Sequence, residues 1–515
     1  MRSDIIRTYK AVHTWTGITT GLLLFVAFYA GALTMFKAPL LRWAEPAVLA
    51  PAPAVLSGDQ LIARTLAQRP ETAKEFTLHL EGPLRLSWQK TRRDDSPFIA
   101  APDADGSIAI GQTRSAGLDW LVDVIHRTGG LPLDVETGTM VTGLAAGLYT
   151  VALVSGLIIL LPSLIKDLFA LRLGHNLKRL WLDAHNLVGL FSLPFHLVMA
   201  LSAVVFGWHD LLYDSLNEAV YKGQMRTVMR ASNPPAPFAG DKSTAVPLGV
   251  DVLLAHVAVV APGFRPTSLQ YRDFGTKAAT VRVSGEDPRY LVRGHGFLLL
   301  GAVSGSVIGT EYLPGQQGVW ASVVSSFFAL HFGSFGGDTV RWGYFALGLA
   351  GAFLFYSGNL LWIESRRRRQ RGGDECPGQS RSSRTMAALT VGICLGCVAG
   401  LSAAIVAARW LQGVFIDVNG WSRGIYYIIF VLALFIALRH GAARAAAPLL
   451  GLAALCTAAI PLSSLLLWRS AVPGIDVVAA CGAVVLAVLA RKTAARAAHG
   501  PADSVWSAAH NAKKV

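Results

Sequence analysis

ALHFGSFGGDTVRWGYFALG, residues 329 to 348, is the stretch that decides the predicted fold. His331 lies in an apolar run, a glycine-rich turn follows it, and a long hydrophobic segment then begins. The same order occurs earlier, where His126 in DVIHRTGG precedes another long apolar segment, and His13 and His185 lie near the starts of two more. Because polar groups inside a membrane are costly and usually functional, these matched histidines guide the interpretation of the whole chain.

The composition is that of a membrane protein, since 53% of the 515 residues are hydrophobic and only 15% are charged. A membrane-spanning helix needs about 20 mostly apolar residues. Eight segments meet this requirement, at residues 12–36, 139–162, 182–207, 340–363, 386–408, 422–438, 447–468 and 474–490. We therefore predict a mainly α-helical membrane protein with about eight transmembrane helices, four of them additional C-terminal helices within 386–490.

The net charge of +14 does not indicate nucleic-acid binding, because the basic residues cluster in alternate loops between the predicted spans. One cluster precedes the first span and others follow the second, fourth, sixth and eighth, with ESRRRRQRGG the densest. Loops rich in lysine and arginine stay in the cytoplasm, so both termini, the linker 364–385 and the tail 491–515 are predicted to be cytoplasmic. The first apolar run is too long for a cleaved signal peptide and is expected to remain as a helix.

The five cysteines give no sign of a disulfide framework, since none lies in the two long segments, 37–138 and 208–339, that would then be external. Cys394 and Cys397 form a C-x-x-C sequence inside a predicted span. Packing between helices through small residues is favoured there over a redox or metal-binding role.

The two external segments have the same order of parts. Each begins with a Pro-rich stretch and continues with a short helical pattern (DQLIARTLAQR or VDVLLAHVAVVA). Alternating strand patterns follow, FTLHLEG and LRLSWQ in the first segment and TSLQYRD and AATVRVSG in the second. A turn-rich stretch in each, DADGSIAIG or AVSGSVIG, then predicts a hairpin strand. Each ends in a helical run with a histidine. The first 363 residues therefore look like two copies of one unit, consisting of a helix, a small α+β domain and a second helix.

The helices that flank these segments also correspond. AVHTWTG and DAHNLVG both contain His-x-x-x-Gly, and the spans that close the two units share a Ser-Gly pair, Ser155-Gly156 and Ser357-Gly358. Parallel repeats about an axis normal to the membrane are a known architecture of membrane proteins. The repeat therefore predicts functional residues in matched pairs.

Five of the thirteen histidines stand out by position: His13, His126, His185, His331 and, deeper in its span, His196. Neutral imidazole is a good axial ligand for haem iron, and a four-helix bundle can hold a haem between facing histidines. By the repeat, His13 and His185 would bind one haem near the cytoplasmic face, and His126 and His331 a second near the external face. His196 is an alternative for one external ligand.

Other chemistries have less support in the sequence. Zinc requires three or four close ligands, commonly including Cys, Asp or Glu, and no HExxH, Walker A or strand-associated GxGxxG motif occurs. Gly17 and Gly189, in the two His-x-x-x-Gly motifs, would let a porphyrin approach the backbone, with close helix packing as the alternative. Since the cytoplasmic loops are too short for a flavin or nicotinamide domain, any electron donor must be a separate molecule.

The order of these motifs, ending in LHFGSFGG and GNLLW, resembles the PepSY-associated transmembrane family over residues 1–365. Within it, the chain looks like iron-uptake members described as ferric-siderophore reductases of the bacterial inner membrane. The resemblance implies two PepSY-like periplasmic domains and two haem b groups, with His13, His126, His185 and His331 as ligands.

The expected function is therefore that of an inner-membrane di-haem b reductase that moves electrons across the lipid bilayer to a ferric siderophore in the periplasm. The donor, cytoplasmic or in the membrane, is unidentified. Reduction to Fe(II) weakens binding by hard oxygen ligands and releases the iron. Two alternatives have no redox activity: a membrane-anchored PepSY-type interaction or regulatory module, and a siderophore transporter.

Overall fold

The computed structural model describes residues 3–45, 56–90, 96–103, 105–113, 115–164, 177–232, 240–292, 294–370, 376–467 and 472–508. The chain divides into two compact units. Unit 1 is helical and comprises Met1–Glu45, Ala116–Asp210 and Trp342–Val515, whereas unit 2 contains the sheet and comprises Pro46–Ser115 and Leu211–Arg341. The Pro-rich openings of the external segments and parts of the basic loops lie outside the described residues.

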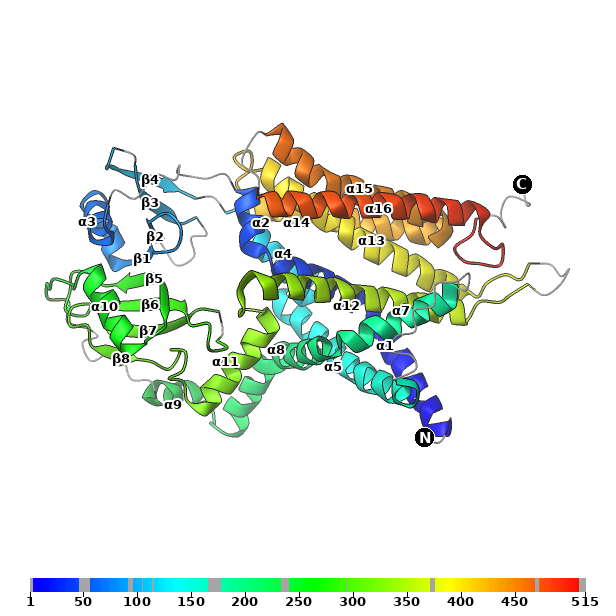
Figure 1. Ribbon diagram of the computed structural model, residues 1–515, viewed down its shortest axis with the longest axis horizontal. Coiled ribbons are helices and arrows are strands. Elements are labelled where there is room, and N and C mark those ends of the chain that lie inside the picture. The colour runs from blue at the N-terminus through cyan, green and yellow to red at the C-terminus, as the bar shows by residue number, and fades with distance from the viewer. Residues whose placement is uncertain are drawn as a thin grey trace. The chain divides into compact units, whose positions relative to one another are not determined.

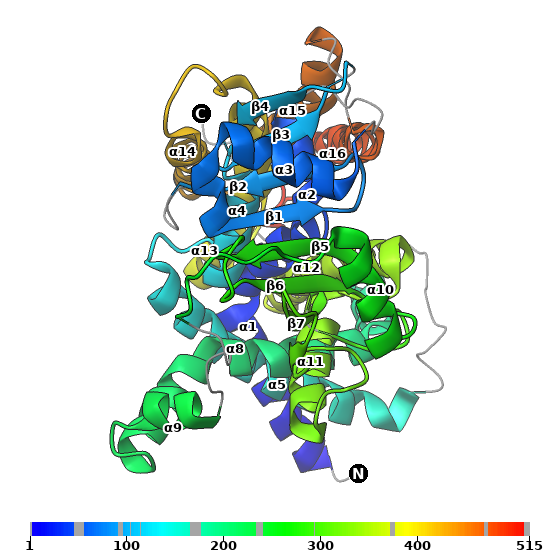
Figure 2. The same ribbon diagram turned by 90° about the vertical axis from the view of Figure 1, so that its left-hand side faces the viewer.

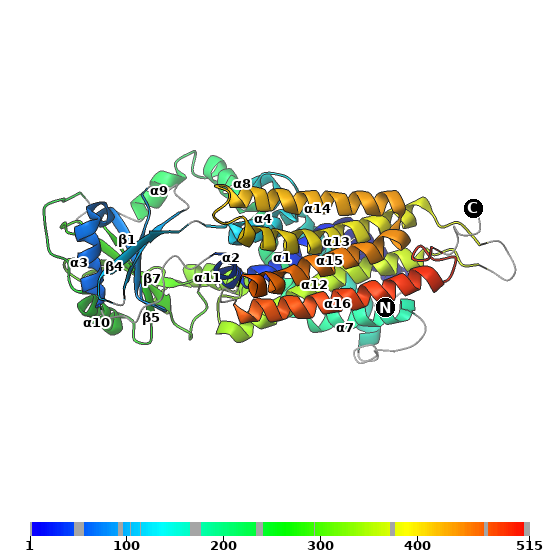
Figure 3. The same cartoon turned by 90° about the horizontal axis from the view of Figure 1, so that it is seen from above.

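Eight helices in the described part of the chain are long and apolar enough to cross a membrane, which confirms the number predicted from the sequence. They are α1 (Ser3–Thr34), α5 (Val135–Leu160), α8 (Leu193–Ala219), α12 (Gly337–Ser365), α13 (Arg381–Trp410), α14 (Val418–His440), α15 (Ala442–Leu466) and α16 (Pro473–His499). The last four lie side by side (Figures 1 and 3). The chain is a multi-pass membrane protein.

The third predicted span, 182–207, is divided between two helices, α7 (Leu177–Phe191) and α8. Ser192 forms the break, and Pro194 follows in the first turn of α8. Proline has no N–H to donate and its ring clashes with the preceding turn of a helix. The helix therefore stops and begins again, with His196 N donating to Ser192 O at 3.0 Å.

Two short helices within the predicted external segment 37–138 belong to unit 1. They are α2 (Lys37–Ala44) and α4 (Leu118–Thr128), and α4 packs against α1, α13 and α14 through buried aliphatic side chains. Glu45 Oε1 accepts a hydrogen bond from Ala116 N at 2.8 Å, so the strand-bearing segment leaves and re-enters unit 1 at one place. Hydrophobicity alone does not reveal that α4 belongs to the helical unit, because α4 is too short to resemble a membrane span.

Small residues let the helices of unit 1 approach closely. A Cβ atom added to Gly207 of α8 would lie 2.5 Å from Gly143 Cα of α5, so the two backbones touch. Cys394 and Cys397 of α13 are free thiols, 2% and 0% exposed, within the core that α13 forms with α1 and α4. Their burial agrees with the predicted packing role.

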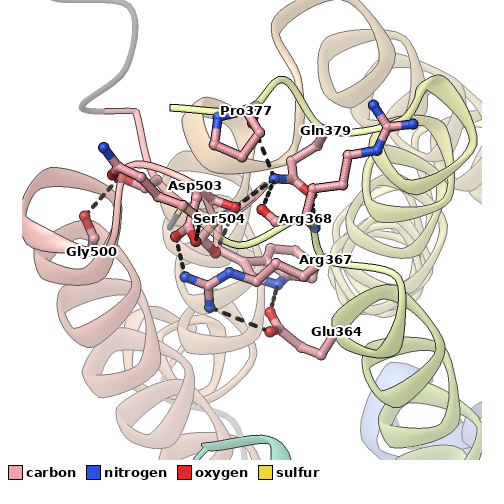
Figure 4. A network of polar contacts seen from close by, with 11 residues as sticks. Glu364, Arg367, Arg368, Pro377, Gln379, Gly500, Asp503 and Ser504 are labelled. Atoms are coloured by element: carbon pink, nitrogen blue, oxygen red, sulfur yellow. Dashed lines mark hydrogen bonds and ion pairs between the residues drawn. The ribbon is translucent and has the colours of Figure 1, made fainter. Parts of the chain in front are cut away.

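The densest basic run is partly enclosed (Figure 4). Arg367 forms ion pairs with Glu364 of α12 and with Asp503 beyond α16, and Gln370 N donates to the same Asp503 carboxylate at 3.1 Å. Burial raises the pKa of Asp503, but the hydrogen bonds from Arg367 and Gln370 outweigh it and leave the pKa below its ordinary value. Gln379 also donates to Asp503 O at 2.8 Å, so this network joins the ends of α12 and α16 to the start of α13.

Unit 2 contains one antiparallel eight-stranded sheet in the order β4-β3-β2-β1-β5-β6-β7-β8. The strands are β1 (Glu75–His79), β2 (Arg85–Trp88), β3 (Phe98–Pro102), β4 (Ile108–Gln112), β5 (Arg265–Arg272), β6 (Thr280–Glu286), β7 (Gly296–Gly301) and β8 (Val307–Gly309). The pairing of β1 with β5 sets Phe76 opposite Tyr271 and Leu78 opposite Leu269. The two external segments therefore share one sheet.

Helices α3 (Gly58–Gln68) and α10 (Val250–Val260) cover one face of this sheet (Figures 2 and 3). Leu61 of α3 and Leu253 of α10 are fully buried against alternate strand residues. Ser57 and Gln60 form a capping box at the start of α3, and Asp59 accepts a hydrogen bond from Val250 N at 3.0 Å. These helices and the strands at FTLHLEG and AATVRVSG confirm the predicted patterns, whereas β3 and β7 were not predicted as separate strands.

The remaining elements of the chain are short. Unit 2 contains α9 (Met225–Ser232), α11 (Val319–Phe332) and the 3-10 helix η1 (Pro70–Lys74), and the 3-10 helix η2 (Leu161–Ser163) follows α5 in unit 1. α11 is the predicted helical run that carries His331, and it ends at Gly333, whose φ of 59° lies in the left-handed region that favours glycine.

Candidate functional site

The side chain of His13, on α1, packs against α5. Its Nδ1 lies 2.8 Å from Ala152 O. Since a carbonyl oxygen only accepts, Nδ1 is the protonated nitrogen and the ring lone pair is on Nε2. Gly156, one turn after Ala152, makes room for the ring, because a Cβ atom there would lie 2.9 Å from His13 Cε1.

His185 of α7 is seated against α12 in the same manner. Its Nδ1 lies 3.0 Å from Ser357 Oγ. That hydroxyl donates to Leu354 O at 3.0 Å, so it accepts from His185 and again leaves the ring lone pair on Nε2. A Cβ atom on Gly358 would lie 3.5 Å from His185 Cε1. Both members of the predicted pair therefore contact the Ser-Gly pair of a closing span.

The rings of His13 and His185 lie close together, at a spacing that suits a shared metal ion. Their centroids are 6.3 Å apart and their planes are inclined at 78°. A bond from an imidazole nitrogen to a first-row metal is about 2 Å long and the nitrogen lies roughly 1 Å from its ring centroid, so two imidazoles on one metal have centroids about 6 Å apart. The structure thus brings His13 and His185 together as the sequence predicts.

The His-x-x-x-Gly motifs leave space next to these rings. A Cβ atom on Gly17 would meet nothing within 4 Å, and one on Gly189 would meet only Leu354 Cδ2, at 3.6 Å. Each glycine lies one helical turn after its histidine and therefore on the same face of the helix. Both histidines therefore have uncrowded space one helical turn further along their own helix face.

His126 of α4 has a similar seat against α1. Its Nδ1 lies 2.8 Å from Ala27 O, and a Cβ atom on Gly31 would lie 2.8 Å from the same nitrogen. Burial lowers the pKa of His126, so the ring is neutral at pH 7. A neutral ring whose Nδ1–H is held by a carbonyl is the state in which histidine binds metals.

His196 of α8 is completely buried and differs from the other three. Neither ring nitrogen has a hydrogen-bond partner among the described residues. Aromatic rings surround it, with Phe28 and Phe195 centroids each 5.5 Å away, and a Cβ atom on Gly351 would lie 3.0 Å from its Cε1. An unpartnered imidazole at this depth is costly, so His196 stays a candidate ligand, although no neighbour fixes its ring.

His331 lies at the end of α11 in unit 2, with its ring edge-on to Phe332 at 5.4 Å. His126 belongs to unit 1 and His331 to unit 2. The pairing of these two histidines therefore stays a prediction from the sequence repeat.

Sequence reasoning missed the groups that orient the histidines. Two of the three anchors are backbone carbonyls, of Ala27 and Ala152, and a carbonyl leaves no mark in the sequence. The third anchor, Ser357, was found only as half of a matched Ser-Gly pair. That match was the available signal, because both glycines turned out to lie against the predicted ligands.

Comparison with known proteins assigns the chain to a family. The family model for the PepSY-associated TM region matches residues 11–365. The chain belongs to the PepSY-associated TM region family. The match contains all five candidate histidines and ends at the last residue of α12, so α13 to α16 lie outside it. The chain is also 25% identical over 358 residues to an uncharacterised protein of Pseudomonas aeruginosa, which covers 65% of this chain and 86% of that one.

Proposed function

We propose that this member of the PepSY-associated TM region family is an inner-membrane di-haem b reductase that passes electrons to a ferric siderophore in the periplasm. The observation that carries the proposal is the His13–His185 pair, whose rings lie 6.3 Å apart with both Nδ1 atoms engaged by hydrogen-bond acceptors. In metal sites, a histidine ligand commonly donates its second N–H to a carbonyl or hydroxyl, which fixes the ring orientation.

The residues of the first site have three roles: binding the iron, orienting the ligands and leaving space beside them. His13 and His185 would hold the haem iron, while Ala152 O and Ser357 Oγ fix the orientation of the two imidazole rings. Gly17 and Gly189 leave room beside the rings. A haem bound there would carry one electron at a time between Fe(III) and Fe(II).

For the second site we propose His126 with His331, as the repeat predicts, and we retain His196 as the alternative partner. Support for His126 comes from its seat, because the carbonyl of Ala27 and the space at Gly31 reproduce the environment of His13. The matched positions of His126 and His331 before their spans support the pairing.

The proposed orientation places unit 2 in the periplasm and the basic loops in the cytoplasm. Its support is the alternation of basic clusters along the eight spans. Electrons would enter from a cytoplasmic or membrane donor near His13 and His185 and leave near His126. One electron reduces one chelated Fe(III) to Fe(II), whose lower charge weakens its bonds to hard oxygen ligands.

The test is the colour and the activity of the purified full-length chain. With haem supplied during expression, we expect a Soret band, an α-band on reduction, and two haems per chain by pyridine haemochrome assay. In vesicles loaded with reductant, ferrozine outside should capture Fe(II) from an added ferric siderophore. His440→Ala, at an exposed helix end, is the control for replacing a histidine.

A colourless chain with full haem supply would reject the proposal and favour an interaction module or a transporter. Haem incorporation without ferrozine capture would reject the reductase activity alone. The two outcomes separate the cofactor from the reaction.

A further inference from the structure

The face of the sheet opposite α3 and α10 has an unusual composition. Strand side chains alternate, so while Phe76, Leu78 and Leu269 point into the helix-covered core, their neighbours lie on the other face. On the four central strands, β2, β1, β5 and β6, that face carries Ser and Thr together with eight larger polar residues. Two of them, Arg265 and Glu286, lie opposite each other at the ends of β5 and β6. We call the other six the polar platform: Glu75, His79, Arg85, Gln270, Arg272 and Arg282.

The single carboxylate of the platform is already engaged. Glu75 Oε1 accepts from Arg272 Nη2 at 3.1 Å and from Gln270 Nε2 at 2.8 Å. Arg272 therefore shares its charge with Glu75, across the β1–β5 pair that joins the two external segments. The second carboxylate of this face, Glu286, lies opposite Arg265 and 3.4 Å from His295 Nδ1. Among the described residues, neither carboxylate forms an ion pair with Arg85 or Arg282.

Arg282 is held without a carboxylate partner among the described residues. Its guanidinium lies over the Phe297 ring, 3.6 Å from the centroid. Burial and the nearby charge of Arg272 both lower the pKa of Arg282. Gln270 lies directly opposite Arg282 in the β5–β6 register. Arg272, two residues further along β5, is therefore the diagonal neighbour of Arg282, at about 7–8 Å. Like charges so placed repel each other and attract an anion.

On the β1–β2 side of the polar platform, Arg85 adds positive charge. Arg85 donates to the carbonyl of Glu81 at 3.2 Å and lies directly opposite His79 in the β1–β2 register. Burial and the charge of Arg85 lower the pKa of His79 to about 4, so this ring is neutral at pH 7. With Arg265 and Glu286 included, four arginines and two glutamates leave two unbalanced positive charges on this face.

We propose that the polar platform binds an anionic, oxygen-rich metal chelate, with Arg272 and Arg282 as the principal contacts. That the chelate is ferric rests on the proposed reductase function. The guanidinium fork matches the two oxygens of a carboxylate, and two arginines at diagonal positions about 7–8 Å apart can contact two carboxylates of one ligand. The Phe297 ring holds the Arg282 guanidinium in place, and the neighbouring Ser and Thr hydroxyl groups suit a ligand rich in oxygen. A cationic chelate would be repelled by the same residues.

The test separates binding from electron transfer by using gallium citrate, since Ga(III) is not reduced under these conditions. Full-length protein in phosphatidylcholine nanodiscs is titrated by calorimetry at low and high salt. We expect saturable binding that weakens as salt rises, and a loss of roughly tenfold or more in Arg272→Gln/Arg282→Gln. Arg226→Gln/Lys242→Gln removes two exposed charges of unit 2 that lie outside the strands of the sheet and should bind within about twofold of wild type.

Reduction assays then relate the platform to the substrate. For ferric citrate, Arg272→Gln/Arg282→Gln should raise KM without changing kcat, while reduction of the cationic chelate ferrioxamine B is unchanged or improved. The proposal is overturned if wild type does not bind gallium citrate, or if both double variants lose binding equally. Normal gallium citrate binding by a chain that reduces neither chelate would contradict the proposed function and leave the platform intact.

Discussion

Gly156→Ala is the substitution that most sharply examines how the first site is built. The new Cβ would lie 2.9 Å from His13 Cε1 and 3.0 Å from Nδ1, whereas ordinary contacts begin at 3.4 Å. The ring must therefore retreat by about 0.5 Å, which stretches the 2.8 Å hydrogen bond from Nδ1 to Ala152 O. Losing most of a hydrogen bond worth about 1 kcal/mol corresponds to roughly fivefold weaker haem binding.

Gly358→Ala is the matched control. Its Cβ would lie 3.5 Å from His185 Cε1, an ordinary contact that requires no movement. Both glycines lie inside membrane-spanning helices, so the gain in helix propensity of about 1 kcal/mol is common to the two variants. The assay titrates haem into chain purified from haem-starved cells and follows the Soret band. Equal affinities in the two variants, or normal affinity in Gly156→Ala, would refute the proposed seat of His13.

Three further outcomes are expected. His331→Ala should abolish ferrozine-detected reduction of external ferric siderophore while the His13–His185 haem stays reducible. An unchanged rate with both haem signals intact would contradict the role proposed for His331. His295→Ala, which replaces an exposed histidine of unit 2, is the control. A chain ending after Gln370 keeps all five candidate histidines but loses α13 and α14, which pack on α1 and α4, so it should bind haem at a lower melting temperature, and a membrane-inserted truncate without haem would contradict this. Because the pKa of His79 is about 4 in the folded chain and 6.5 unfolded, unfolding takes up a proton between these values and stability falls as the pH is lowered from 6.5 to 4. His79→Asn should make this fall smaller by about 1 kcal/mol, allowing for partial solvent exposure, and thermal unfolding at pH 7.5 and 4.5 that shows an equal fall in both proteins would contradict it.

The membrane-spanning helices were the most predictable part of the fold. A run of about 20 apolar residues is a strong signal because lipid offers the backbone no hydrogen bonds, and eight such runs became eight helices. The break at Ser192 was missed because hydrophobicity continues through it. Pro194 was the available sign, since proline interrupts a helix whatever the polarity around it.

The sheet shows what local patterns leave undetermined. Alternation located β1, β2, β5 and β6. The joining of both external segments through Phe76–Tyr271 and Leu78–Leu269 was not predicted, because strand partners far apart in sequence leave no local signature. The polar platform was missed for the same reason, since Arg272 and Arg282 become neighbours only in the paired sheet.

The candidate site, like the sheet, was only partly predictable from the sequence. Matched positions in the two predicted copies of the sequence repeat selected His13 and His185, and the structure brings their rings together. The role of Ala152 O in orienting His13 required three-dimensional contacts, as every residue has a carbonyl. Arg367 was likewise expected in a solvated linker, but its partner Asp503 lies more than a hundred residues away in sequence.

The central claim is that His13 and His185 bind the same haem. The most direct measurement compares haem content and the reduced-minus-oxidised spectrum of His13→Ala, His185→Ala and the double variant with wild type. The account predicts that each single variant loses one of two haems and that the double variant loses no more than either single variant. Loss of both haems in the double variant, or retention of both haems in either single variant, would contradict it.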